Sequence, residues 1–196
     1  MLGMTRLVAS FVLLAVGSGA AGGCDRGTLP HTSSVATQTL RPCPVSAAAR
    51  RAELPTARLH CLGPGASTLA LDHLPARPYI VNFWASWCEP CQREAPRLAA
   101  AVAAMGGRVA FLGVDTQDDR DSALKFLQRF GLDYPQLIDP NGDVLYRLPA
   151  PGLPVTIAVN ASGRLVYRRL GEITSTQLTA ALKAIDPHRP VGSALG

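Results

Sequence analysis

The stretch Trp87-Cys88-Glu89-Pro90-Cys91 contains the residues of this chain that are best suited to chemistry. Two cysteines separated by two residues can close a small, reversible disulfide. An apolar run, Tyr79-Ile80-Val81-Asn82-Phe83-Trp84, precedes them and an amphipathic stretch follows, which predicts a strand, a turn and a helix that starts near Cys88. The free N–H groups and the positive dipole at a helix N-terminus stabilise a thiolate, the reactive form of cysteine. We therefore expect thiol–disulfide exchange at Cys88 and Cys91.

A zinc site is the alternative use of two cysteines at this spacing. It needs a second pair of ligands at short spacing, whereas Cys43 and Cys61 are far apart and the four histidines are dispersed. We therefore expect no metal and no cofactor. An acidic group further along lacks the spacing of a calcium loop, and we expect it to cap a helix: Asp115, Asp118, Asp119 and Asp121.

The elements that would hold the motif follow from periodicity. Apolar residues recur on one helical face from Ala95 to Met105, with Pro96 inside this helix as a predicted kink and Gly106-Gly107 at its end. A second apolar strand, a second helix ending at Gly131, a strand pair and a last helix come later. Their expected positions are 109–114, 123–130, 155–159, 165–170 and 178–185, after a short strand at 68–71 and with a short helix up to Leu148.

Composition limits the classes of function that the chain can have. With 196 residues, 47% of them hydrophobic, it can form one domain with extensions. The formal net charge is +5, but the arginines are scattered and no basic stripe with interleaved aromatic residues appears. We therefore expect no nucleic-acid partner.

The N-terminus has the pattern of an export signal. Arg6 gives a positive start, residues 7–16 are apolar, and residues 17–23 are small. An apolar segment of this length is too short to cross a bilayer as a helix. We expect a signal peptide over 1–23 that is cleaved, so that the protein acts outside the cytoplasm.

Cys24 directly follows this signal and resembles the lipidated cysteine of bacterial lipoproteins, although Ala21 stands where that pattern usually has leucine. Lipidation would anchor the protein to the outer face of the cell membrane. It would also explain the odd number of cysteines, since four then remain to pair. Ordinary cleavage, which would leave a secreted protein with a free thiol, is the alternative. We expect a flexible tether over 24–53, a folded domain over 54–186 and a tail over 187–196.

In this order of elements the chain resembles the thioredoxin superfamily, and within it the TlpA/ResA-type extracytoplasmic thiol–disulfide oxidoreductases. The resemblance rests on residues 81–91, on Pro96, on Gly113-Val114-Asp115 with the helix after it, and on residues 152–156. It implies an α/β fold in which helices flank a central mixed β-sheet that carries the central insertion of this family.

The resemblance also implies roles for individual residues. Cys88 would be the nucleophile that forms a mixed disulfide, and Cys91 would resolve it. The proline of the loop at 152–156 would be cis and face the cysteine pair, which would leave the backbone before it free to pair with an extended substrate. The residues expected at the cis bond and in contact with substrate are Pro154, Leu153, Trp87, Glu89 and Pro90.

The resemblance implies an acid/base role for Glu94. Cytoplasmic thioredoxins have a buried aspartate where this chain has Asn82, and an asparagine cannot remove a proton from Cys91. In ResA-like proteins a glutamate three residues after the second cysteine lies near the site, and Glu94 occupies that position. The alternative is a solvated carboxylate that stabilises the first turns of the helix.

Cys43 and Cys61 remain after the redox pair and Cys24 are assigned. In an oxidising compartment they are expected to form a structural disulfide that fixes the end of the tether to the domain. A second redox pair is the alternative.

Three other functions compete with the one that we expect, the reduction of disulfides in exported proteins. By resemblance, the substrates would include apocytochrome c cysteines and the electron donor would be a membrane protein of the CcdA/DsbD type. An oxidase that introduces disulfides differs only in reduction potential, which the sequence does not give. A thiol peroxidase would need proline and threonine where Val81 and Ala85 stand, and a lipoprotein that only binds partners would not need an intact cysteine pair.

Overall fold

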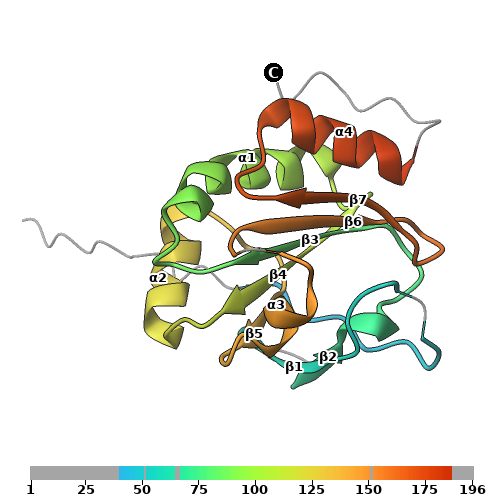
Figure 1. Ribbon diagram of the computed structural model, residues 1–196, viewed down its shortest axis with the longest axis horizontal. Helices are drawn as coiled ribbons and strands as arrows, with labels where there is room; N and C mark the ends of the chain where they lie inside the picture. The colour runs from blue at the N-terminus through green and yellow to red at the C-terminus, as the bar shows by residue number, and fades with distance from the viewer. Residues whose placement is uncertain (1–39, 51, 65–66, 151, 187–196) are drawn as a thin grey trace, which may run out of the picture. The chain divides into compact units, whose positions relative to one another are not determined.

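A single mixed β-sheet organises the part of the chain that the computed structural model describes, which is residues 40–50, 52–64, 67–150 and 152–186. Its order is β2-β1-β5-β4-β3-β6-β7 (Figure 1). Strands β3, β4 and β5 run parallel to one another, and every other neighbouring pair is antiparallel. The strands are β1 (Arg58–Cys61), β2 (Thr68–Ala70), β3 (Tyr79–Trp84), β4 (Ala110–Thr116), β5 (Gln136–Asp139), β6 (Val155–Val159) and β7 (Leu165–Leu170).

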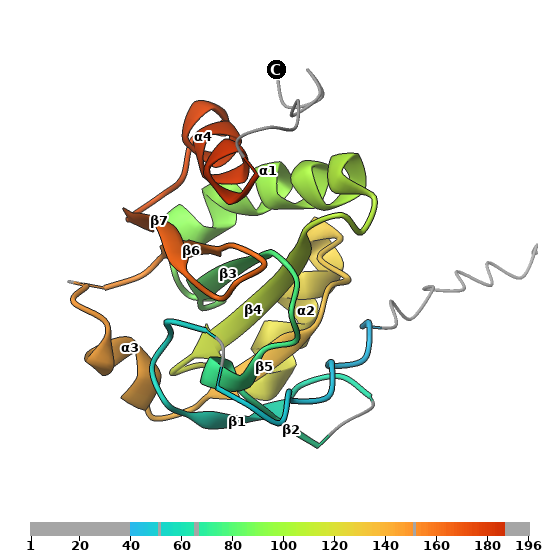
Figure 2. The same ribbon diagram turned by 90° about the vertical axis from the view of Figure 1, so that its right-hand side faces the viewer.

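Helices cover both faces of this sheet, and the sheet separates the apolar core into two clusters (Figure 2). The long helix α1 packs with α2 and α4 in one apolar cluster, whereas α3 packs in the other with β1 and β2. Their bounds are α1 (Glu89–Met105), α2 (Arg120–Phe130), α3 (Asp143–Arg147) and α4 (Ser175–Ile185), with a short 3-10 helix at Leu71–His73. Since β3 lies between the clusters, all of its side chains are buried.

This architecture confirms the expected α/β fold with a mixed sheet flanked by helices. Strand β3 has the expected bounds, and α1 ends at Gly106 in the left-handed conformation that glycine favours. Helix α2 and β5 stand between β4 and α3, at the place of the expected insertion. The sequence did not predict β1 or β5, because neither short segment is an unbroken apolar run.

The described part of the segment before residue 54 packs against the domain at several points, which differs from the expected flexible tether. Leu40, Cys43 and Ala52 are buried, and the backbone N–H of Arg41 donates to the Asp133 carbonyl at 2.7 Å. A second contact, an ion pair of 2.8 Å, joins the same two residues. The folded part therefore includes residues from 40 onward. The sequence did not predict this packing, because a segment without helix or strand has no hydrophobic periodicity.

Several expected features lie outside the described residues: the signal peptide over 1–23, Cys24 and the tail over 187–196. Among the residues that are described, none of the helices combines the length and the hydropathy needed to cross a membrane.

Candidate active site

Cys88 and Cys91 form a disulfide where β3 turns into α1. Their sulfur atoms are 2.05 Å apart and their Cα atoms 5.2 Å apart. Cys88 is the N-cap of α1, and its sulfur accepts a hydrogen bond from the backbone N–H of Cys91 at 3.3 Å. Pro90 lies in the first turn, where a missing N–H leaves no helical bond unmade. Both cysteines are largely buried, Cys88 at 4% exposed and Cys91 at 1%.

The loop between β4 and α2 holds the turn that leads to Cys88. The Trp87 indole N–H donates to the Gln117 carbonyl at 2.9 Å, while its ring stays 60% exposed. The Ser86 hydroxyl donates to an Asp118 oxygen at 2.8 Å, and the Ser86 backbone N–H donates to the other oxygen of the same carboxylate. These contacts fix the turn, and no local sequence pattern predicts the pairing of Ser86 with Asp118.

The loop before β6 lies at the same end of the sheet as the cysteine pair. The Leu153–Pro154 peptide bond is cis, and β6 begins directly after it. Val155 pairs with Phe83 near the end of β3, so the loop is beside the strand that leads to Cys88. Leu153 packs against the apolar cluster that contains both cysteines.

Glu94 is fully buried on α1, one turn after Cys91. Its Oε1 accepts a hydrogen bond from the Asn82 side-chain amide at 2.8 Å, and its Oε2 accepts one from the Ile173 backbone N–H at 2.8 Å. Burial raises the pKa of Glu94 from 4.5 to about 7, although both hydrogen bonds favour the carboxylate. The alternative of a solvated surface carboxylate is therefore wrong. The structure therefore has, one helical turn after Cys91, a buried carboxyl whose raised pKa lies near neutral pH.

Asp115 is a second buried carboxyl at this end of the sheet, and the sequence interpretation missed it. It pairs with Trp84 across β3 and β4, is 1% exposed, and its Oδ1 has no hydrogen-bond partner. Burial, followed by the charge of Asp118, raises its pKa to about 8. Only Asp119 of the acidic group acts as the N-cap of α2, with bonds to the N–H groups of Asp121 and Ser122. The sequence signal that could have identified Asp115 is the position of a carboxyl inside an otherwise apolar strand.

Cys43 and Cys61 form the other disulfide, with Cα atoms 6.3 Å apart. It joins the segment before residue 54 to β1. Cys43 and Cys61 pack in the cluster on the α3 side of the sheet, whereas Cys88 and Cys91 pack in the cluster on the α1 side. The structure thus keeps the two disulfides in separate parts of the core.

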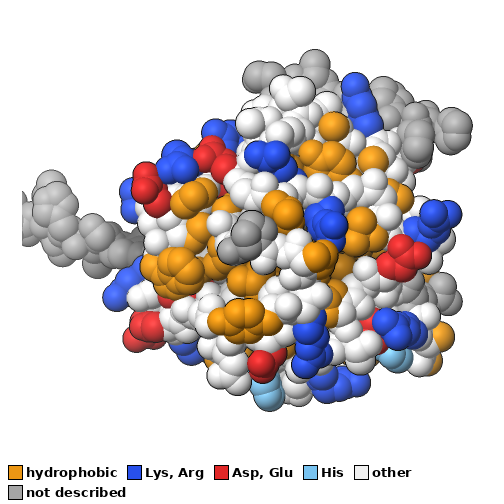
Figure 3. All heavy atoms as spheres, viewed as in Figure 1, with side chains coloured by type: hydrophobic (Ala, Val, Ile, Leu, Met, Phe, Trp, Pro, Cys, Tyr) orange, Lys and Arg blue, Asp and Glu red, His pale blue; other side chains and the backbone are white. Residues whose placement is uncertain are grey.

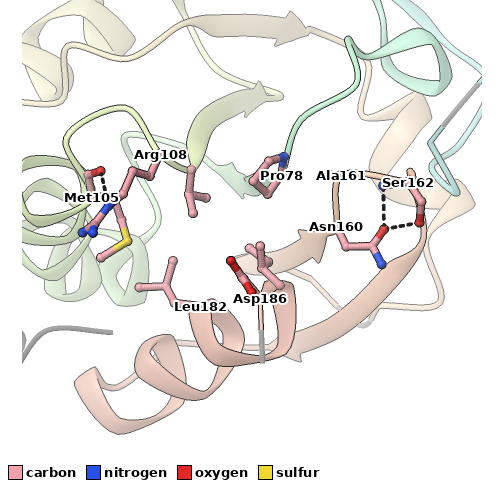
Figure 4. A pocket seen from close by; sticks show the side chains of 10 residues that line it. Pro78, Met105, Arg108, Asn160, Ala161, Ser162, Leu182 and Asp186 are labelled. Atoms are coloured by element: carbon pink, nitrogen blue, oxygen red, sulfur yellow. Dashed lines mark hydrogen bonds between the residues drawn. The ribbon is translucent and has the colours of Figure 1, made fainter. Parts of the chain in front are cut away.

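A cavity of about 530 Å³ lies at the opposite end of β3 (Figure 4). Pro78, which precedes β3, lines it together with Met105 and Arg108 at the end of α1 and Leu182 on α4. Since the cysteine pair follows the other end of β3, this cavity is not part of the redox site.

Comparison with known proteins agrees with this geometry. A family model described as Redoxin matches residues 49–185. Thiol:disulfide interchange protein HelX of Rhodobacter capsulatus is 35% identical over 136 residues, which cover 69% of this chain and 74% of HelX. Thiol-disulfide oxidoreductase ResA of Bacillus thuringiensis is 30% identical over 121 residues, which cover 61% of this chain and 69% of ResA.

Among solved structures, a secreted thiol-disulfide isomerase of Corynebacterium glutamicum is similar, with a TM-score of 0.56 and 31% identity. The match covers 68% of this chain and 85% of that one. The relatives, the fold and the disulfide at the start of α1 all agree with the resemblance found in the sequence. The chain belongs to the Redoxin family and is a thioredoxin-like thiol–disulfide oxidoreductase related to HelX and ResA.

Proposed function

We propose that this protein reduces disulfide bonds in exported proteins and becomes oxidised to the Cys88–Cys91 disulfide in doing so. The observation that carries the exchange chemistry is the Cys88–Cys91 disulfide at the start of α1, with the buried Glu94 one turn after Cys91 as a group that can accept a proton near neutral pH. The reducing direction rests on the resemblance to ResA-type proteins. Residues three apart on a helix are neighbours on its surface, so Glu94 and Cys91 share a face.

The first step is attack by the Cys88 thiolate on a substrate disulfide. The N-terminal end of α1 favours this thiolate through its dipole and its free N–H groups. One Cys88 sulfur–substrate sulfur bond forms, the substrate disulfide breaks, and one substrate sulfur leaves as a thiolate. The product is a mixed disulfide between Cys88 and the substrate.

The second step closes the disulfide seen in the structure. Glu94 accepts the proton of the Cys91 thiol, and the Cys91 thiolate attacks the Cys88 sulfur. The mixed disulfide breaks and the second substrate sulfur leaves with both electrons of that bond. The substrate has then gained two electrons, and Cys88 and Cys91 have lost them. A membrane dithiol donor, of the CcdA/DsbD type by resemblance, would reduce the pair again.

Substrate would contact the surface around Cys88. Trp87 is exposed, and the Glu89 side chain is 84% exposed, so both are open to a partner. We assign Pro90, Leu153 and Pro154 to the same contact surface. On the face of the molecule seen in Figure 3, hydrophobic side chains gather between α1, α2 and α3, which suits an unfolded protein segment as substrate.

The place of action is part of the proposal. Similarity to a secreted thiol-disulfide isomerase supports a position outside the cytoplasm. The resemblance to TlpA/ResA-type proteins supports apocytochrome c cysteines as a substrate class. We assign residues 1–23 to a signal peptide, Cys24 to a lipid anchor and residues 187–196 to a tail. Replacement of Cys24 by serine would release the protein from the membrane fraction.

Thiol trapping in living cells tests the direction of electron flow. The reductase has Cys88 and Cys91 mostly as thiols at steady state, whereas a mostly oxidised pair would overturn the proposal in favour of an oxidase. A Cys91→Ser variant should accumulate mixed disulfides through Cys88, because the resolving thiol is absent. A Cys61→Ser variant is the matched control and should accumulate none through Cys88.

A further inference from the structure

Glu172 links the loop between β7 and α4 to the helix that carries the cysteines. Its Oε2 accepts a bond from Arg93 Nε at 2.7 Å, and its Oε1 accepts one from Arg97 Nη1 at 2.9 Å. The Glu172 side chain is 25% exposed and the Arg97 side chain 33% exposed, so solvent screens this pair only in part.

The same loop supplies the backbone N–H that contacts Glu94. Arg97 Nη1 also donates to the Ile173 carbonyl at 3.3 Å, and the Ile173 N–H donates to Glu94 Oε2 at 2.8 Å. Arg97 therefore holds both Glu172 and Ile173 against α1, and in this way keeps the N–H of Ile173 aimed at Glu94.

Few groups face Glu94 from the elements packed around it. Asn82 on β3 and the Ile173 N–H donate to its two oxygens. The charged or ionisable side chains that act on it, or on which it acts, are Arg97, Glu172 and Tyr134. The nearby positive charge of Arg97 lowers the pKa of Glu94, and the negative charge of Glu172 raises it.

We propose that Arg97 and Glu172 are positioning residues that act on Glu94 in opposite directions, Arg97 favouring its carboxylate and Glu172 its protonated form. The balance between them sets the pH at which Glu94 can take the Cys91 proton, a consequence that rests on the proposed function. The two residues touch neither cysteine in any contact of the described residues, and they work through the Ile173 N–H and through their charges.

The test follows the amide proton of Ile173 by NMR as a function of pH in the oxidised protein, where the cysteines do not titrate. Because this amide donates to Glu94, its chemical shift reports the ionisation of that carboxyl. We expect the midpoint to rise in Arg97→Gln by about half a pH unit or more, since a positive charge and the hold on Ile173 are both lost. In Glu172→Gln we expect it to fall by a similar amount.

Three further variants make the result specific. Glu94→Gln should abolish the titration of the Ile173 amide, which proves what the signal reports. Arg97→Lys keeps the positive charge, so its pH midpoint should lie closer to that of the parent protein than the midpoint of Arg97→Gln does. Arg93→Gln removes an arginine that contacts Glu172 but not Ile173, and should move the midpoint less than Arg97→Gln. If Arg97→Gln and Glu172→Gln moved the midpoint in the same direction, or neither moved it, the proposal would be wrong.

A kinetic experiment separates this proposal from the function on which it rests. The reduced protein is mixed with a protein disulfide such as that of insulin, and the rate is followed across pH. We expect its midpoint to move in the same two directions in Arg97→Gln and Glu172→Gln. If the NMR midpoints move and the kinetic ones do not, Arg97 and Glu172 still set the ionisation of Glu94, but Glu94 does not take the Cys91 proton.

Discussion

The side-chain amide of Asn82 donates a hydrogen bond of 2.8 Å to Glu94, and so joins the central strand β3 to the helix that carries both cysteines. The same nitrogen also lies 3.2 Å from the Thr156 hydroxyl on β6. An amide cannot ionise, so this contact leaves Glu94 as the one carboxyl of the pair. Under the proposed function, the group that accepts the Cys91 proton is therefore on α1 and not on β3.

Replacement of Asn82 by aspartate tests this assignment. Two carboxyls in hydrogen-bond contact cannot both ionise easily and would share a proton, so the pKa of Glu94 should rise above its value of about 7. We expect the pH midpoint of disulfide reduction to move upward by about one unit or more. Asn82→Ala, which only removes the donor, should move it upward by less, and an unchanged midpoint in both variants would exclude Glu94 as the acceptor.

Asp115→Asn should change how stability depends on pH. The pKa of Asp115 is about 8 in the folded protein against 3.8 ordinarily, so between these values the folded state holds a proton that the unfolded state has lost. Its contribution to the free energy of unfolding therefore falls as pH rises through this window, by ~1.4 kcal/mol per pH unit for one proton. Asparagine cannot titrate, so the variant should lose this part of the slope and be more stable than the parent at pH 8.

Urea unfolding of the oxidised protein at pH 5, 6, 7 and 8 measures this effect. Asp121→Asn is a suitable control, because Asp121 is an exposed carboxyl in the next helix and should leave the slope unchanged. Parallel pH curves for the parent and the Asp115→Asn protein would contradict a protonated Asp115.

Gly113→Ala should destabilise the centre of the sheet. A Cβ atom at Gly113 would lie 1.7 Å from Gln136 Oε1, which accepts a hydrogen bond from the Trp84 indole at 3.0 Å. The new methyl group must displace the Gln136 side chain and leave the buried indole N–H without its acceptor. We expect a loss of about 2–4 kcal/mol in the free energy of unfolding.

The double variant Gly113→Ala/Gln136→Ala identifies the cause. Removing the Gln136 side chain leaves nothing for the new methyl group to displace, so the double variant should be less destabilised than the sum of the single variants. Additive losses would mean that Gly113 is needed for a reason other than contact with Gln136.

Loss of the Cys43–Cys61 disulfide should affect stability and leave exchange intact. The bond closes a loop with a sequence separation of 18, and the chain-entropy relation gives about 3 kcal/mol for a loop of this size. We expect Cys43→Ser/Cys61→Ser to unfold at lower denaturant while the Cys88–Cys91 pair keeps its equilibrium with glutathione. A shift in that equilibrium would instead support the second redox pair that the sequence left open.

The sequence predicts the elements that have a strong local signal. Tyr79–Trp84 is an unbroken apolar run, and the cysteine spacing marks the start of α1, so both were found. Strands β1 and β5 exist because they pair with each other and with β2 and β4, and such long-range pairing leaves little trace in four residues. Composition separated the domain from its extensions only roughly, since Leu40 and Cys43 pack without any periodic pattern.

In the candidate site, too, some features have a local sequence signal and others depend on long-range contacts. The cysteines, Pro154 and Glu94 stand at positions that motif and resemblance mark. The burial of Glu94, the unpaired oxygen of Asp115 and the bridge from Arg97 to Ile173 depend on which loops meet at this end of the sheet. No local sequence pattern predicts these contacts, because the residues that make them come from separate parts of the chain.

If Cys24 carries the proposed lipid, the packing of Leu40 against the domain would limit how far from the membrane the protein could work. With a lipid on Cys24, the chain between the anchor and the folded part would run from residue 24 to 40 rather than to 53. Full extension at ~3.4 Å per residue gives a reach of about 55 Å, against about 100 Å for the longer tether. The anchored form that we propose would then serve disulfides that lie within this distance of the bilayer plus the width of the folded part.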